Sequence, residues 1–103
     1  MSKLKTTTKG RKKTGVRDSN PMHPGSILSS YYMTEMNLNQ TQLAEKIGCS
    51  HRKVNEVVNG KRGITPDFAL DLERVLGVSA EMWVNMQAAY DLWVARQKKR
   101  RVA

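Results

Sequence analysis

Four polar side chains recur at helical spacing in the middle of the chain, opposite a stripe of valines. They are His51, Arg52, Asn55 and Glu56. An arginine can donate two parallel hydrogen bonds to a guanine edge, an asparagine can pair with adenine in the same way, and a glutamate can accept from cytosine. A solvated helix face carries the same residue types, so these four residues alone leave both interpretations open.

Residues suited to catalysis or metal binding are few and poorly spaced. The two histidines, His23 and His51, lie 28 positions apart, and neither has a nucleophile or an acid at a spacing typical of a catalytic set. Cys49 is the sole cysteine and is most simply a small turn residue. No glycine-rich phosphate loop is present. We therefore predict that the chain is not an enzyme, binds no metal ion and needs no cofactor.

The net charge of +9 lies at the two ends of the chain. Residues 1–20 contain seven Lys or Arg and one Asp, and residues 96–103 contain five Lys or Arg. Residues 21–95 contain six basic and eight acidic residues. Basic ends bind nucleic acid in some proteins and are merely solvated in others, so total charge does not decide the partner.

Composition divides the chain into one domain with basic ends. Residues 1–20 are rich in Lys, Thr, Gly and Ser and should form a disordered basic tail. The predicted domain spans 21–97, and a second basic tail spans 98–103. A core this small favours a homodimer. No apolar stretch suits a membrane span or a signal segment, and one cysteine fits a reducing compartment, so we expect a cytoplasmic protein without a membrane partner.

Capping residues and glycines divide the domain into five predicted helices, with no strand-like alternation between them. The first helix should end near residues 36–37, and each of the next three should end beside a glycine. The expected starts are Pro24 for the first helix and the N-caps Asn39, Ser50, Thr65 and Ser79 for the others. The sequence therefore predicts an all-α fold.

Residues 40–61 have the pattern of two short helices joined by a three-residue turn. Their sequence is QTQLAEKIGCSHRKVNEVVNGK. Apolar residues of both helices face one another, and Ala44 must be small because the helices approach closely there. Such a pair holds a rigid crossing angle and projects the polar face of its second helix towards a major groove. The pattern predicts a DNA-binding helix-turn-helix motif.

This segment resembles the Cro/phage-repressor (Xre-type) helix-turn-helix family. The family pattern Q-x-x-L-A-x-x-x-G-[small]-[ST]-x-x-x-[IV]-x-x-[hydrophobic]-x-N-G is met throughout. Four further blocks resemble the HigA (virulence-associated protein I) antitoxin subfamily, and the match covers residues 22–95. They are MHPG at 22–25, GITPD at 63–67, LGVSAEMW at 76–83 and MQAAYDLW at 86–93. Ser26 is a departure, since the subfamily usually has Glu there.

The resemblance implies a five-helix Cro/repressor-like domain and a role for each site residue. The base-reading residues are His51, Arg52, Asn55 and Glu56, although Glu56 could instead orient Arg52. The phosphate-binding residues are Gln40, Ser50, Lys53, Asn59, Lys61 and Arg62. Capping alone would also explain Ser50 and Asn59. The last helix, 80–97, is assigned to self-association through residues that could equally be core, namely Trp83, Met86, Tyr90 and Trp93.

Three functions follow as hypotheses. The resemblance implies the antitoxin of a type II toxin-antitoxin pair, a homodimer that neutralises a HigB-type, RelE-like ribonuclease toxin. Such an antitoxin also represses its own operon by binding a palindromic double-stranded operator. The alternative is a stand-alone Xre-type transcriptional repressor without a toxin partner. The third is an adaptor module whose motif has lost DNA affinity, a possibility raised by the acidic middle of the chain.

Overall fold

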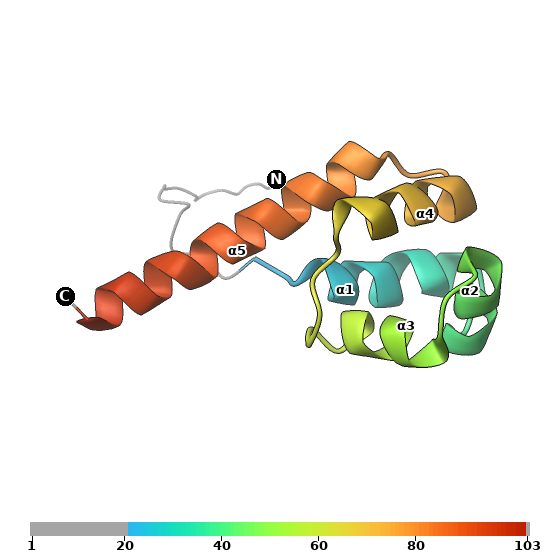
Figure 1. The fold of residues 1–103 in the computed structure, drawn as a ribbon, viewed down its shortest axis with the longest axis horizontal. Coiled ribbons are helices and arrows are strands. Elements are labelled where there is room, and N and C mark those ends of the chain that lie inside the picture. Colours follow the sequence, from blue (N-terminus) through green and yellow to red (C-terminus); the bar gives the residue numbers. More distant parts are fainter. Residues whose placement is uncertain (1–20, 103) are drawn as a thin grey trace, which may run out of the picture.

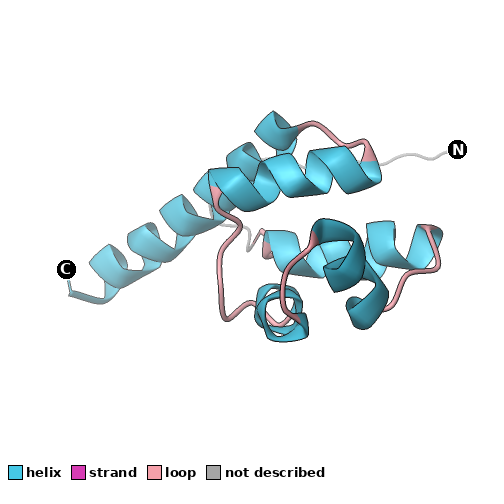
Figure 2. Cartoon of the chain, turned by 45° about the vertical axis from the view of Figure 1, so that its right-hand side comes forward, coloured by secondary structure: helices cyan, strands magenta, loops and turns pink. Residues whose placement is uncertain are grey.

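The computed structural model describes residues 21–102, and within that range it is built of helices and loops without strands (Figure 2). The predicted all-α class is therefore confirmed. The predicted disordered tail, residues 1–20, lies outside the described residues. The elements in chain order are α1 (Pro24–Ile27), the π-helix η3 (Leu28–Met33), α2 (Gln40–Ile47), α3 (His51–Val58), α4 (Pro66–Leu76) and α5 (Ala80–Val102).

The first predicted helix contains a π-helical segment. α1 begins after His23, whose Nδ1 accepts a hydrogen bond from the Gly25 amide at 2.9 Å. The chain then continues directly into η3, and the segment ends at Asn37, whose φ of 57° is left-handed. A π-turn adds a residue to the helical turn and shifts the face that the following side chains present. The hydrophobic pattern did not reveal this local change.

The predicted N-caps are confirmed. Asn39 and Gln42 form a reciprocal capping box at the start of α2. The hydroxyl oxygens of Ser50, Thr65 and Ser79 each accept the amide of the residue three positions further on. These bonds satisfy amides that a helix start leaves unpaired, and they fix where α2, α3, α4 and α5 begin.

The core lies between α4 and α5 on one side and the layer of α1, η3, α2 and α3 on the other (Figure 1). Arg74 of α4 adds a polar tie across these layers, since it donates to the carbonyls of Lys46 and Ile47 at the end of α2. The layer of α4 and α5 thus packs against the helix-turn-helix pair and fixes its position. The largest fully buried side chains include Trp83, Phe68, Leu28, Leu43, Leu72, Val54 and Val57.

The backbone of α1 lies directly on the end of α3. A Cβ atom added to Gly25 would fall 1.7 Å from the carbonyl oxygen of Val57 and 2.7 Å from its carbonyl carbon. No side chain fits in that space, because nonbonded carbon and oxygen atoms cannot approach so closely. Gly25 is therefore required for α1 to support α3.

The last helix, α5, is longer than predicted. We expected a helix over 80–97 and a tail over 98–103, but α5 continues to Val102. The added residues, 98–102, are mostly Lys and Arg, which are good helix formers, and cations are favoured near a helix C-terminus. The second half of α5 projects away from the other helices (Figure 1). No helix in the described part of the chain is long and apolar enough to cross a membrane.

Candidate nucleic-acid interface

α3 presents a polar face whose first residues are exposed. His51 and Arg52 are exposed in the first turn, directly after the Ser50 N-cap, and the Arg52 side chain is 84% exposed. On the opposite side, Val54 and Val57 are fully buried. The packing therefore fixes the orientation of α3 and leaves its N-terminal polar side chains free to contact a partner.

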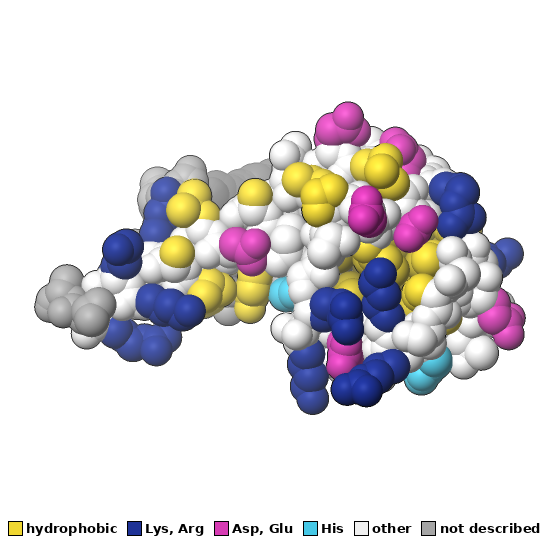
Figure 3. Space-filling view, viewed as in Figure 1, with side chains coloured by type: hydrophobic (Ala, Val, Ile, Leu, Met, Phe, Trp, Pro, Cys, Tyr) yellow, Lys and Arg dark blue, Asp and Glu magenta, His cyan; other side chains and the backbone are white. Residues whose placement is uncertain are grey.

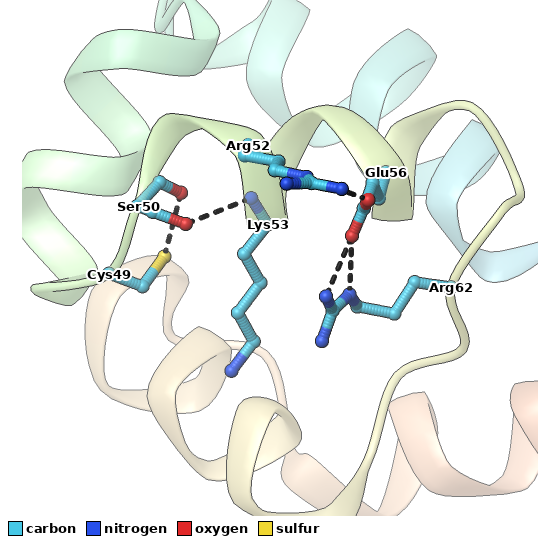
Figure 4. Close-up of polar contacts among 6 residues, drawn as sticks. All are labelled: Cys49, Ser50, Arg52, Lys53, Glu56 and Arg62. Carbon is cyan, nitrogen blue, oxygen red and sulfur yellow. Dashed lines mark hydrogen bonds and ion pairs between the residues drawn. The ribbon is translucent and has the colours of Figure 1, made fainter.

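Glu56 holds two arginines from different elements (Figure 4). Its Oε1 accepts from Nη2 of Arg62 at 2.7 Å and from Nε of Arg62 at 3.0 Å. Its Oε2 accepts from Nε of Arg52 at 3.2 Å. Hydrogen bonds donated by Arg62, and to a smaller extent by Arg52, hold the pKa of the Glu56 carboxyl below its usual range. Both carboxylate oxygens are therefore engaged, and the group is ionised at neutral pH.

Asn55 and Gln40 join the two helices of the motif. Nδ2 of Asn55 donates to Oε1 of Gln40 at 3.1 Å, and both residues are half-buried. We predicted separate roles for them, with Asn55 on bases and Gln40 on phosphate. The structure brings them together, and this bond leaves Asn55 with a second N–H and its amide oxygen for further contacts.

Lys53 lies at the junction of α3 and α4. Its ammonium nitrogen is 4.9 Å from the centre of the Phe68 ring, and its side chain points away from Glu56 (Figure 4). The face of an aromatic ring attracts a cation, so this contact holds the charge of Lys53 beside α4. The predicted phosphate role of Lys53 stays a prediction.

Lys and Arg side chains gather along the lower edge of the domain, where α3 and the loop after it lie (Figures 1 and 3). Asn59 caps the end of α3, and Lys61 and Arg62 are exposed on the loop. The Lys61 amide donates to the backbone carbonyl of Glu56 at 2.8 Å, which ties this loop to α3. The predicted phosphate residues of the loop therefore adjoin the predicted base-reading residues.

Gln87 supports that loop, a role that the sequence analysis missed. Its Oε1 accepts from the Ile64 amide at 2.8 Å, and its Nε2 donates to Asp91 at 2.9 Å. Nearby, the rings of His23 and Tyr90 meet edge to face at 4.9 Å, and burial lowers the pKa of His23 despite the opposing charge of Asp91. Gln87 and Tyr90 thus connect α5 to the loop and to the start of α1. Their place in the MQAAYDLW block was the available signal.

The residues predicted for self-association differ in accessibility. Trp83 is 0% exposed and packs edge to face on Tyr32, with ring centres 5.4 Å apart. It leaves no surface for a second chain, so we withdraw Trp83 from the predicted interface. Met86, Tyr90 and Trp93 are half-buried and keep that predicted role.

Cys49 occupies the turn between α2 and α3. It is half-buried, and burial raises the pKa of its thiol, so the thiol is protonated at neutral pH. This arrangement fits the predicted role of a small turn residue. Across the described residues, His, Cys, Asp and Glu side chains form no cluster that could hold a metal ion.

Two short helices, a tight turn and an outward polar face on the second helix define a helix-turn-helix protein. The chain belongs to the helix-turn-helix family, whose domain matches residues 30–83.

Individual relatives are similar over most of their length. The chain is 42% identical over 88 residues to virulence-associated protein I of Dichelobacter nodosus, covering 85% of this chain and 82% of that one. It is 34% identical to Pseudomonas aeruginosa antitoxin HigA, solved with the higBA promoter, with a TM-score of 0.75 and coverage of 79% and 88%. A HigA-family addiction module antidote protein from Coxiella burnetii is 35% identical, with a TM-score of 0.75 and coverage of 81% and 90%. The predicted resemblance and the Cro/repressor-like fold are confirmed.

Proposed function

We propose that this chain is a HigA-type antitoxin that represses its own operon by inserting α3 into the major groove of an operator. The observation that carries the proposal is Arg52, which is 84% exposed at the start of a helix whose other face is locked into the core. An arginine in this position can pair with a guanine edge. His51 and Asn55 extend the same face and are the further base-reading candidates.

Phosphate contacts would come from both ends of the motif. Gln40 and Ser50 stand at the starts of α2 and α3, where backbone amides attract anions, and Lys61 is exposed on the loop after α3. A homodimer would place two copies of α3 about 34–36 Å apart, one turn of duplex, on a palindromic site. Pseudomonas aeruginosa HigA, solved with the higBA promoter, supports operator binding as the shared activity.

Replacing Arg52 by alanine tests the DNA assignment. We expect Arg52→Ala to weaken operator binding by about 1–3 kcal/mol and to relax preference at one position in each half-site, because one base-reading side chain is lost. Binding is measured by fluorescence anisotropy on a duplex selected by the parent chain and on random duplex. Arg96→Ala, which removes the same exposed side chain from the projecting part of α5, is the control. Equal affinities for Arg52→Ala and the parent on both duplexes would refute the groove assignment.

The toxin partner is supported by the relatives named HigA and not by a contact within this chain. We expect the protein, purified from its native operon, to carry a small basic RelE-like ribonuclease that mass spectrometry identifies. Co-expression should then relieve the growth arrest caused by that partner. A chain that represses its operator but neither retains a partner nor relieves arrest is the stand-alone repressor instead.

A further inference from the structure

The contacts of Glu56 leave its two arginine partners in different states. Arg52 uses only Nε on the carboxylate, so its two terminal nitrogens keep the fork that fits a guanine edge. Arg62 uses Nε together with Nη2, which engages one side of its guanidinium. The Glu56 carboxylate thus leaves the terminal nitrogens of Arg52 available, whereas it restrains Arg62 on the loop after α3.

We propose that Glu56 is a positioning residue that orients Arg52 for base readout and withholds Arg62 from phosphate. The inference rests on the proposed function and concerns the same surface. Of the two roles left open for Glu56, orientation of Arg52 is thereby chosen over base reading, and the predicted phosphate role of Arg62 is revised, because Arg62 holds no phosphate while Glu56 is ionised. The consequence is a higher selectivity for operator over random DNA. Nonspecific affinity falls because Arg62 is not available to phosphate, and Arg52 is already oriented for a base before DNA binds.

Burial supports this division of roles. The Glu56 side chain is 25% exposed, against 84% for Arg52 and 48% for Arg62. Glu56 therefore lies behind its partners, and a base edge would meet Arg52 first. The backbone carbonyl of Glu56 also accepts from Lys61 at 2.8 Å, so main chain and side chain of one residue together fix the loop against α3.

Electrostatics gives the same result. An ionised Glu56 between two arginines reduces the local charge of the three side chains from +2 to +1. Nonspecific affinity for duplex depends on cations that neutralise phosphates, whereas sequence preference depends on groups that reach base edges. Restraint of Arg62 therefore lowers the nonspecific affinity for duplex, and orientation of Arg52 raises the sequence preference.

The test replaces Glu56 by glutamine, which keeps the shape and removes the charge. We expect the operator-to-random affinity ratio of Glu56→Gln to fall roughly threefold to tenfold, part of the effect of a whole arginine–base pair. The slope of log affinity against log salt should steepen by about 0.9 per protomer as Arg62 gains a phosphate. Glu73→Gln is the matched control, because Glu73 is exposed on α4, outside the helix-turn-helix pair, and a glutamine oxygen can still accept from the Ala80 amide.

A second variant tests Arg62 directly. Arg62→Ala should leave the salt slope almost unchanged, whereas loss of a real phosphate contact would flatten it by about 0.9. The inference is overturned if Glu56→Gln matches Glu73→Gln in both ratio and slope. If Glu56→Gln has a lower operator-to-random affinity ratio but an unchanged salt slope, the restraint of Arg62 is overturned and the orientation of Arg52 is retained. If the parent selects no sequence, the proposed function itself has failed, and that outcome is read from the parent alone.

Discussion

Replacing Gly25 by alanine is expected to lower the free energy of unfolding by about 3 kcal/mol or more, at the upper end of overpacking effects. The new Cβ would lie 1.7 Å from the Val57 carbonyl oxygen, a backbone atom of α3, and the position of a Cβ is itself fixed by the backbone of α1. No side-chain rotation relieves such a clash, so α1 must move away from α3. The midpoint of thermal unfolding should fall by about 12 °C or more.

Gly48→Ala provides the control for this prediction. Gly48 has a φ of +88°, but a Cβ there would meet no atom within 4 Å, so its substitution strains only the local backbone. We expect a loss of about 1–2 kcal/mol for Gly48→Ala. Both variants are compared by denaturant unfolding monitored by circular dichroism. A Gly25→Ala protein as stable as Gly48→Ala, or more stable, would show that α1 does not lie on α3.

Replacing Trp83 by alanine is expected to cost about 3–5 kcal/mol of folding free energy, the range for loss of a buried aromatic side chain. Trp83 is fully buried between α5 and the rest of the core, and its ring packs on Tyr32. Its indole Nε1 is buried without a hydrogen-bond partner among the described residues. Trp83→Phe should therefore cost much less, because it keeps an aromatic ring and removes that unpaired donor.

Denaturant unfolding of these variants, combined with sedimentation equilibrium, separates folding from self-association. Trp93 lies in the second half of α5 and is half-buried, in contrast to the fully buried Trp83, so Trp93→Ala should remain folded. If α5 is the self-association helix, Trp93→Ala should weaken the dimer in sedimentation equilibrium. A Trp83→Ala protein that unfolds like the parent but no longer self-associates would restore the interface role withdrawn above.

Helix starts and ends were predictable because their signals are local. The reciprocal bonds of Asn39 and Gln42 involve residues three positions apart, and the left-handed ends at Gly48 and Gly77 depend on the absence of a side chain. Buried Val54 and Val57 followed from helical spacing in the same way. The helix-turn-helix motif consists almost wholly of such local features, so its pattern specified the fold and the outward face of α3.

The contacts that tune the site were not predictable from spacing. Gln87 reaches a loop amide 23 positions away, and Lys53 lies over a ring of another helix. The shared use of Glu56 by Arg52 and Arg62 depends on the path of the loop after α3, which no capping rule describes. The length of α5 was underestimated because a run of cations was interpreted as a tail, although the same residues are good helix formers.

Site-directed cross-linking tests the central claim that α3 is the element in the groove. In a Cys49→Ser background, His51→Cys places a thiol on exposed α3 and Glu73→Cys places one on exposed α4, and each thiol carries the same short photoreactive group. On operator duplex bound by either protein, we expect cross-links to bases from position 51, in two half-sites about one helical turn apart, and none from position 73. Base cross-links from position 73, or bound protein without base cross-links from position 51, would contradict this claim.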